Sequence, residues 1–335
     1  MGILDLFHRN SYSCDFLNTN LQFTNRDTLE ACCGASIGPV LADKLSQKDS
    51  IKEFIKNREK YIKQLKAGSL KNGTAGCKNC INLKKYKQTN DYRIKRITLN
   101  HFTACNCACC YCTDGQNRDF VNIRETAEDA CDILKFINEL YDNDLIDKKN
   151  LIVDFQGGEA ACLKNHREII DTFYTRGVKE LVLFTNNIVY IPSMEPLLRQ
   201  DKGSLVVTID CGTPETFYQI KQVDKFDIVI KNLKRYIEAA GNSHITARYV
   251  LIHRLNDNME ELKAFLDLML EINIKLFVID IDYRNIIEED FTIPKHYYEL
   301  IDYMKEFCRK NRRTFSMWSY TEEVLRRGYS ISNRS

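Results

Sequence analysis

The segment CNCACCYC, residues 105–112, places five cysteines within eight positions. Three of them, Cys105, Cys109 and Cys112, have the spacing CxxxCxxC. Thiolates at this spacing can hold three irons of a 4Fe-4S cluster and leave the fourth iron open to another molecule. The same segment also contains CxC and CxxC spacings, which tetrahedral zinc or a copper site would accept. The residues therefore predict a metal centre, and iron-sulfur, zinc and copper ligation all stay open at this point.

The composition is that of an ordinary globular protein. The chain has 335 residues, of which 44% are hydrophobic and 28% charged, enough for one large domain or a domain with a small module. It has no long apolar run and no pattern of a secretory signal at its N-terminus, so we expect a cytoplasmic protein without a membrane span. In such a chain, fourteen cysteines indicate metal binding or catalysis rather than disulfides.

From residue 93 onward the sequence alternates between strand-like and helical patterns. Strands that are separated by helices pair in parallel, with right-handed crossovers. Six such units form either an open sheet or a partial barrel, and both place functional residues at the carboxyl ends of the strands. The cysteine segment directly follows the first strand, so we expect it at that face. The six predicted strands are residues 93–100, 150–156, 180–187, 204–210, 245–252 and 275–283.

The N-terminal part of the chain differs in charge from the rest. Residues 52–96 hold fourteen Lys and Arg against three acidic residues, although the whole chain carries a net charge of only +2. The periodicity of residues 50–68 predicts a helix whose basic face is either simply solvated or an anion-binding surface. We predict a cysteine-rich basic module over residues 1–92, a core over 93–290, and a C-terminal helix and tail over 291–335.

This module carries a second set of cysteines. Cys32 and Cys33 are adjacent, and Cys77 and Cys80 form a CxxC pair. Four thiolates are enough for a second 4Fe-4S cluster or for a structural zinc, while free buried thiols are the third interpretation. Because adjacent cysteines rarely bind one ion together, Cys14 could replace one of the first pair.

The segment at residues 105–112 resembles the cluster-binding loop of the radical S-adenosylmethionine (radical SAM) superfamily. The pattern of that loop is CxxxCxΦC with an aromatic residue at Φ, where this chain has Tyr111, and the form CNxxCxYC is frequent in peptide- and sugar-modifying branches. The resemblance implies a 4Fe-4S cluster on Cys105, Cys109 and Cys112, with S-adenosylmethionine (SAM) bound at the open iron and Tyr111 among the residues that bind it. It further implies a partial (β/α)6 barrel.

The second predicted strand ends in Gly157, Gly158 and Glu159, as the family's Gly-Gly-Glu element does. Two glycines let the backbone come close to a ligand, and a carboxylate accepts hydrogen bonds from an ammonium group. In the family this element holds the amino group of SAM. The same role is therefore implied for these three residues.

Three later strand ends extend the resemblance. The third and fourth strands end in TNN and TID, where the family has TNG and SxD, so Asn187 replaces a glycine and Thr208 replaces a serine. Thr208 keeps a hydroxyl for the ribose or carboxylate of SAM, and Arg248 on the fifth strand could form a bidentate pair with that carboxylate. The alternatives are that Thr208 only favours the strand and that Arg248 makes a structural ion pair.

The resemblance implies an enzyme that reductively cleaves SAM to a 5′-deoxyadenosyl radical, which abstracts hydrogen from a peptide or sugar substrate. The outcome would be oxidation, epimerisation or bond formation, with electrons from a donor such as flavodoxin or ferredoxin. The basic module would help to hold an anionic substrate. In an epimerase Cys211 could return the hydrogen atom, although strand alternation turns it away and favours a small buried hydrophobe.

The alternative from another class is a non-enzymatic zinc-binding module that contacts nucleic acid. Zinc binding requires no Gly-Gly-Glu element one strand later. A surface for single-stranded nucleic acid would have stacking aromatics among its basic residues, and residues 52–96 contain few. These observations favour the enzyme.

Overall fold

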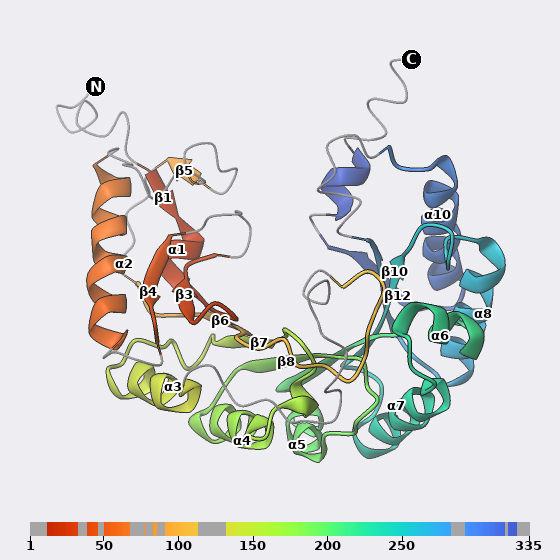
Figure 1. Ribbon diagram of the computed structural model, residues 1–335, viewed down its shortest axis with the longest axis horizontal. Helices are drawn as coiled ribbons and strands as arrows, with labels where there is room; N and C mark the ends of the chain where they lie inside the picture. The colour runs from red at the N-terminus through yellow and green to blue at the C-terminus, as the bar shows by residue number, and fades with distance from the viewer. Residues whose placement is uncertain are drawn as a thin grey trace. The chain divides into compact units, whose positions relative to one another are not determined.

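The computed structural model describes residues 12–32, 39–45, 50–67, 77, 83–85, 91–112, 132–282, 292–318 and 321–326 (Figure 1). No helix within these ranges is long and apolar enough to cross a bilayer. The chain divides into two compact units. The first comprises residues 1–103, 126–158 and 163–181, and the second comprises 104–125, 159–162 and 182–335.

The sheet of the first unit has the strand order β7-β6-β2-β3-β4. β6 (Arg96–Asn100) pairs in parallel with β7 (Ile152–Phe155) on one side and with β2 (Asn20–Thr24) on the other. β2 continues antiparallel to β3 (Thr28–Glu30), which pairs antiparallel with β4 (Val40–Asp43). The N-terminal residues therefore add three strands beside β6.

Helix α2 (Ser50–Lys66) packs against β4 (Figure 1). The helix carries a buried arginine, Arg58. The Nε of Arg58 donates to the carbonyl of Leu17 at 3.1 Å, and its Nη2 donates to the carbonyls of Asn18 and Tyr92. Burial lowers the pKa of Arg58 to about 10. Arg58 thus ties the helix to two backbone segments, because a buried guanidinium must find acceptors for its N–H groups.

Helix α3 shows how the sequence pattern produces these elements. Its N-cap, Asp132, accepts a hydrogen bond from the backbone N–H of Lys135 at 3.0 Å. Apolar residues at helical spacing give it one buried face. The remaining elements of the first unit are α1 (Asp15–Thr19), α4 (His166–Arg176), and β1 (Tyr12–Cys14) paired with β5 (Leu83–Lys85), while α3 itself spans Ile133–Asp142.

The second unit contains the strand order β12-β11-β10-β9-β8. β9, β10, β11 and β12 pair in parallel with their neighbours. Along β9 buried residues alternate with half-buried ones, so one face of the strand packs in the core and the other is more accessible. The strands are β8 (Glu180–Thr185), β9 (Gly203–Thr208), β10 (Ile245–Leu251), β11 (Leu276–Ile281) and β12 (Thr314–Met317).

Helices follow these strands along the chain. α10 packs against α8 and β12, and α6 packs against α7 (Figure 1). α6 begins with Thr213 as its N-cap, whose side chain accepts from the N–H of Thr216, and with Pro214 at the first helical position. The helices are α5 (Glu195–Arg199), α6 (Pro214–Lys221), α7 (Phe226–Ala240), α8 (Met259–Glu271) and α10 (Lys295–Lys310).

All six strands predicted from the sequence are present, and the α/β class is confirmed. The sequence patterns did not reveal the short N-terminal strands or β12. The N-terminal helix forms as predicted. The helical pattern before β7 also includes residues 125–131, which lie outside the described residues. The domain boundaries at residues 92 and 290 stay a prediction.

Gly212, directly after β9, provides a test of this packing. A Cβ at Gly212 would lie 2.2 Å from the backbone nitrogen of Phe265 on α8, so Gly212→Ala must push the helix away. We expect a loss of about 2 kcal/mol or more in the free energy of unfolding. Gly177→Ala is the control, since its Cβ meets nothing within 4 Å and only its φ of +88° costs about 1 kcal/mol. Equal urea midpoints for the two variants would contradict this close approach.

Candidate active site

The cysteine loop (residues 104–112) belongs to the second unit and is fixed to the end of α6. The backbone N–H of Ala108 donates to the carbonyl of Lys221 at 3.0 Å, and that of Cys110 donates to the carbonyl of Ile220 at 2.9 Å. Cys110 and Tyr111 also pack on a buried apolar cluster formed by Ile220, Val250 and Ile252. The loop therefore has a defined conformation in its middle, and the side chain of Cys110 is engaged in packing.

Two further thiols of the loop, those of Cys105 and Cys109, lie near Cys107. Cys105, Cys109 and Cys112 are half-buried, whereas Cys107 is 3% exposed and hydrogen-bonds through its thiol to Cys105 and Cys109. These bonds, followed by burial, raise the pKa of Cys107, and the bond from Cys107 lowers the pKa of Cys109. Cys107 thus contacts two of the three predicted ligands, a contact that the spacing alone did not indicate.

The donor chemistry of this loop fits an iron-sulfur cluster. Three half-buried thiols on one short loop are the soft ligands that iron-sulfur clusters take. Among the described residues, no three Cys, His, Asp or Glu side chains are gathered closely enough to hold a metal ion. The ligand set Cys105, Cys109 and Cys112 therefore stays a prediction that rests on residue type and spacing.

Glu159 is 1% exposed, and both of its carboxylate oxygens are held by the end of β8. The hydroxyl of Thr185 donates to Oε1 at 2.8 Å, and the backbone N–H of Asn186 donates to Oε2 at 2.7 Å. Its own backbone N–H donates to the carbonyl of Ala104 at 2.7 Å. Burial, and next the negative charge of Cys105, raise the pKa of Glu159 to about 8. A buried carboxylate beside the cysteine loop is thus held in one orientation.

The two glycines before Glu159 belong to the first unit, and the structure gives a reason for the first. Gly157 has a φ of +120°, and a Cβ there would lie 2.9 Å from the carbonyl oxygen of Phe102. The backbone N–H of Gly158 donates to that same carbonyl at 3.1 Å. Only glycine accommodates both the dihedral angle and the close approach at position 157.

Asn186 links Glu159 to the cysteine loop. Its backbone contacts the carboxylate, while its side-chain amide donates to Oδ1 of Asn106 at 2.6 Å and contacts Sγ of Cys105 at 3.7 Å. The family pattern singled out only the next residue, Asn187, which replaces a glycine. Asn187 has a φ of +62°, which explains how asparagine can stand where the family pattern has glycine, since asparagine tolerates the left-handed region better than other side chains.

Thr208 and Arg248 lie opposite each other in the parallel pairing of β9 and β10. Arg248 is already engaged, because its Nη2 and Nε donate to Oδ2 of Asp280 at 2.8 and 3.1 Å. Its guanidinium also lies 4.1 Å from the centroid of the Trp318 ring, and Asp280 accepts a further bond from Thr321. These contacts favour the structural ion pair, and roles of Thr208 and Arg248 in cofactor binding stay predictions.

Cys211 is fully buried. Its thiol donates to the carbonyl of Ile209 at 3.3 Å, and burial raises its pKa well above the ordinary value. This environment favours the interpretation as a small buried hydrophobe. The hydrogen-donor role stays a prediction.

In the first unit, strand pairing bears on the N-terminal cysteines. Cys14 on β1 lies opposite Leu83 on β5 in the antiparallel register, so it is close in space to the chain just after the CxxC pair. The pairing supports Cys14 as a member of that set. Three of these cysteines are half-buried, namely Cys14, Cys32 and Cys77. Two predicted members lie outside the described residues, Cys33 and Cys80.

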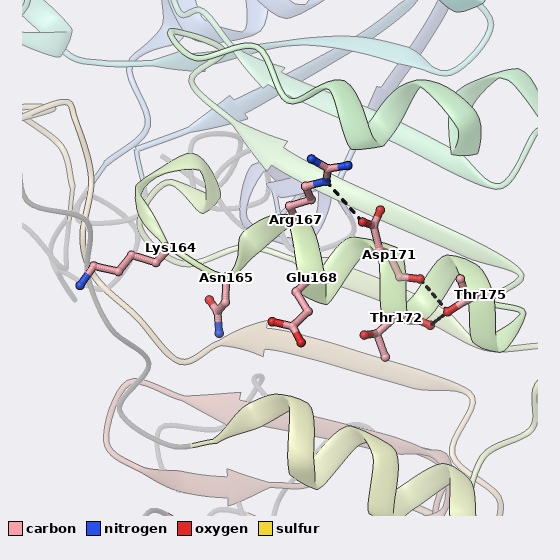
Figure 2. Close-up of a pocket in the computed structure, with 7 residues that line it drawn as sticks. All are labelled: Lys164, Asn165, Arg167, Glu168, Asp171, Thr172 and Thr175. Atoms are coloured by element: carbon pink, nitrogen blue, oxygen red, sulfur yellow. Dashed lines mark hydrogen bonds and ion pairs between the residues drawn. The ribbon is translucent and has the colours of Figure 1, made fainter.

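A hollow on the surface of α4 lies apart from all these residues in the sequence. It is lined by polar side chains of the helix and the residues before it, and Figure 2 shows Arg167 reaching toward Asp171, 3.5 Å between Nε and Oδ2. The lining contains no residue of a predicted site. The residues are Lys164, Asn165, Arg167, Glu168, Asp171, Thr172 and Thr175.

Comparison with known proteins gives partial matches. No protein-family model matches the chain. A GTP 3′,8-cyclase of Mannheimia succiniciproducens is 31% identical over 106 residues, and one of Haemophilus influenzae is 29% identical over 111 residues. These segments cover 31% and 33% of this chain, and the chain spans only about a third of each relative, 31% and 32%.

The fold is similar to that of solved structures over a larger part of the chain. Streptococcus suis SuiB bound to S-adenosylmethionine matches 81% of this chain and 56% of its own, with a TM-score of 0.52 and 15% identity. SuiB bound to the precursor peptide SuiA matches with a TM-score of 0.51 and 14% identity, over 81% of this chain and 54% of that one. This similarity confirms the partial barrel fold.

The cysteine motif and the order of the strand-end elements thus resemble the radical SAM superfamily, the partial sequence matches are to GTP 3′,8-cyclases, and one structure with a similar fold contains bound S-adenosylmethionine.

Asn187 allows a test of the strand-end geometry. Replacing it with glycine or with alanine removes the same hydrogen bond, from its Nδ2 to the carbonyl of Val229 at 3.0 Å. Only alanine also suffers from the positive φ, so Asn187→Ala should be less stable than Asn187→Gly by about 1 kcal/mol. Thermal unfolding of the two variants measures this difference. Identical stabilities would contradict the left-handed backbone at this position.

Proposed function

We propose that the protein is an enzyme that binds a 4Fe-4S cluster through Cys105, Cys109 and Cys112 and reductively cleaves SAM. One observation carries the proposal. Asn186 contacts the carboxylate of Glu159 through its backbone and Sγ of Cys105 through its side chain. Glu159 and Cys105, which are 54 positions apart in the sequence, thus share a partner within one unit, as joint binding of a cluster and SAM requires.

The residues of this chain supply binding and orientation. The fixed carboxylate of Glu159 would accept hydrogen bonds from the ammonium group of SAM, and Thr185 and Asn186 keep that carboxylate in place. Thr208 would bind the ribose or the carboxylate of SAM. Arg248 would bind the carboxylate of SAM if that carboxylate displaces Asp280, the present partner of Arg248. When bound, the cluster and SAM supply an electron and a 5′-deoxyadenosyl radical that abstracts hydrogen from the substrate.

We further propose a peptide substrate, modified by oxidation, epimerisation or bond formation. The support is that one structure with this fold is described as bound to a precursor peptide, and that the N-terminal residues are basic enough to attract an anionic segment. A nucleotide is the second candidate, because the partial sequence relatives are named GTP 3′,8-cyclases. Flavodoxin or ferredoxin would supply electrons.

The cysteine variants test the cluster directly. In anaerobically reconstituted protein, Cys105→Ala, Cys109→Ala and Cys112→Ala should each abolish the formation of 5′-deoxyadenosine under a strong reductant, because each removes a cluster ligand. Cys110→Ala should retain it, since Cys110 packs on the apolar cluster. Cys107→Ala should retain it too, since the assignment gives Cys107 only contacts to the ligands. Equal loss in all five variants would refute this ligand set.

The N-terminal cysteines allow a second measurement. We propose that Cys77 and Cys80, with Cys14, Cys32 or Cys33, hold an auxiliary 4Fe-4S cluster. The double variant Cys77→Ala/Cys80→Ala should then lose about four irons per chain and keep SAM cleavage at the first cluster. Finding zinc instead of this iron in anaerobically isolated protein would assign these cysteines a structural role.

A further inference from the structure

Asp210 and Lys221 form a buried ion pair at the edge of the site. Nζ of Lys221 lies 2.5 Å from Oδ2 of Asp210, and their side chains are 1% and 0% exposed. Desolvation makes such a pair costly, so it contributes little to stability compared with well-packed apolar residues. A buried pair of this kind is best explained by what its geometry holds in place.

The aspartate end of the pair is anchored to β10 and the turn after it. Oδ1 of Asp210 accepts from the backbone N–H of Val250 at 2.8 Å, and its carbonyl accepts from Nδ2 of Asn256 at 2.7 Å. Asn256 in turn accepts from the N–H of Ile252 at 2.7 Å. The backbone of Asp210 has a φ of +67°, a conformation that these bonds maintain. Asp210 is therefore a rigid acceptor.

The lysine end of the pair is attached to the cysteine loop. Tyr111, between Cys110 and Cys112, donates its hydroxyl to Oδ2 of Asp210 at 2.6 Å and accepts from Nζ of Lys221 at 3.0 Å. The carbonyl of Lys221 accepts from the N–H of Ala108. Lys221 thus holds the loop through both its backbone and its side chain.

The pair therefore contacts the loop on both sides of Cys109, at Ala108 and at Tyr111. Hydrogen bonds near cluster sulfurs are among the features that set cluster potentials.

We propose that Asp210 and Lys221 are positioning residues that, through Tyr111, hold the cysteine loop in the shape in which Cys109 and Cys112 would carry the cluster. The part that concerns the cluster rests on the proposed function. The part that concerns the loop does not depend on a bound cluster. Neither residue is assigned to contact SAM or substrate.

The first experiment measures hydrogen exchange of the cysteine loop in full-length, cluster-free protein. Tyr111→Phe keeps the ring packing but removes the link to the pair, so the amides of Ala108 and Cys110 should exchange at least about tenfold faster than in wild type, which corresponds to about 1.4 kcal/mol. Tyr297→Phe, which removes a buried hydroxyl on α10 that has no hydrogen-bond partner among the described residues, is the control and should leave both amides unchanged. Unchanged exchange in Tyr111→Phe would overturn the loop-holding role.

The second experiment measures the reduction potential of the reconstituted cluster. The double variant Asp210→Asn/Lys221→Met removes both charges without leaving one unpaired. Its potential should differ from that of wild type, because the ligands of the loop are no longer held in the same arrangement, and an unchanged potential in the folded variant would overturn the inference. If the double variant does not fold, the potential of Tyr111→Phe decides in its place, because that variant also loosens the loop.

The two experiments also separate this inference from the proposed function. Wild-type protein that takes up no cluster and forms no 5′-deoxyadenosine would refute the proposed function and the part of the inference that concerns the cluster. The exchange experiment would still decide whether the pair holds the loop. Wild-type protein that cleaves SAM, with variants that match it in exchange and potential, would refute the inference alone.

Discussion

The carboxylate of Glu159 is the group on which the site depends. A carboxylate with 1% exposure is costly unless its oxygens are hydrogen-bonded, and both donors come from the end of β8. Thr185 and Asn186 must therefore be placed together, which requires β8 to end where it does. Asn186 then extends the same network to Asn106 and Cys105 of the cysteine loop. One buried carboxyl group thus fixes the relation between a strand end and the loop.

The other side of the cysteine loop is fixed in a different way. Backbone bonds to the end of α6 and the apolar contacts of Cys110 and Tyr111 hold its middle and last part. The ion pair of Asp210 and Lys221 joins this region to β9 and α6. The loop is thus held by hydrogen bonds at Cys105 and by packing and charge at Tyr111.

The sequence predicted the strands and the Gly-Gly-Glu element because both depend on local patterns. Parallel strands buried between helices produce short apolar runs, and Gly157 reflects a local backbone requirement. Asn186 and Lys221 could not be found in this way, since an asparagine next to another asparagine and a lysine at a helix end are typical of the surface. Their roles come from partners up to 110 positions away, which periodicity does not encode. The only signal in the sequence was position. Asn186 stands in the strand-end motif, and Asp210, the ion-pair partner of Lys221, stands at the next strand end.

Arg248 illustrates the opposite case. Its place on the fifth strand predicted a contact with the carboxylate of SAM, and the structure gives it Asp280 and Trp318 as partners. Sequence spacing identified the face on which Arg248 lies but not the carboxylate nearest to it. A contact with the carboxylate of SAM and a structural ion pair with Asp280 both agree with a guanidinium at the carboxyl end of a strand. Only the binding of SAM distinguishes the two interpretations.

The central claim is that the cysteine loop holds a cluster with one iron open to SAM, next to Glu159. Electron paramagnetic resonance of the reduced, reconstituted protein, recorded with and without SAM, tests it most directly. The account predicts that SAM changes the spectrum of the cluster in wild-type protein, because SAM binds to the open iron, and that Glu159→Gln requires a higher SAM concentration for the same change. A cluster spectrum that stays identical at saturating SAM would contradict the claim.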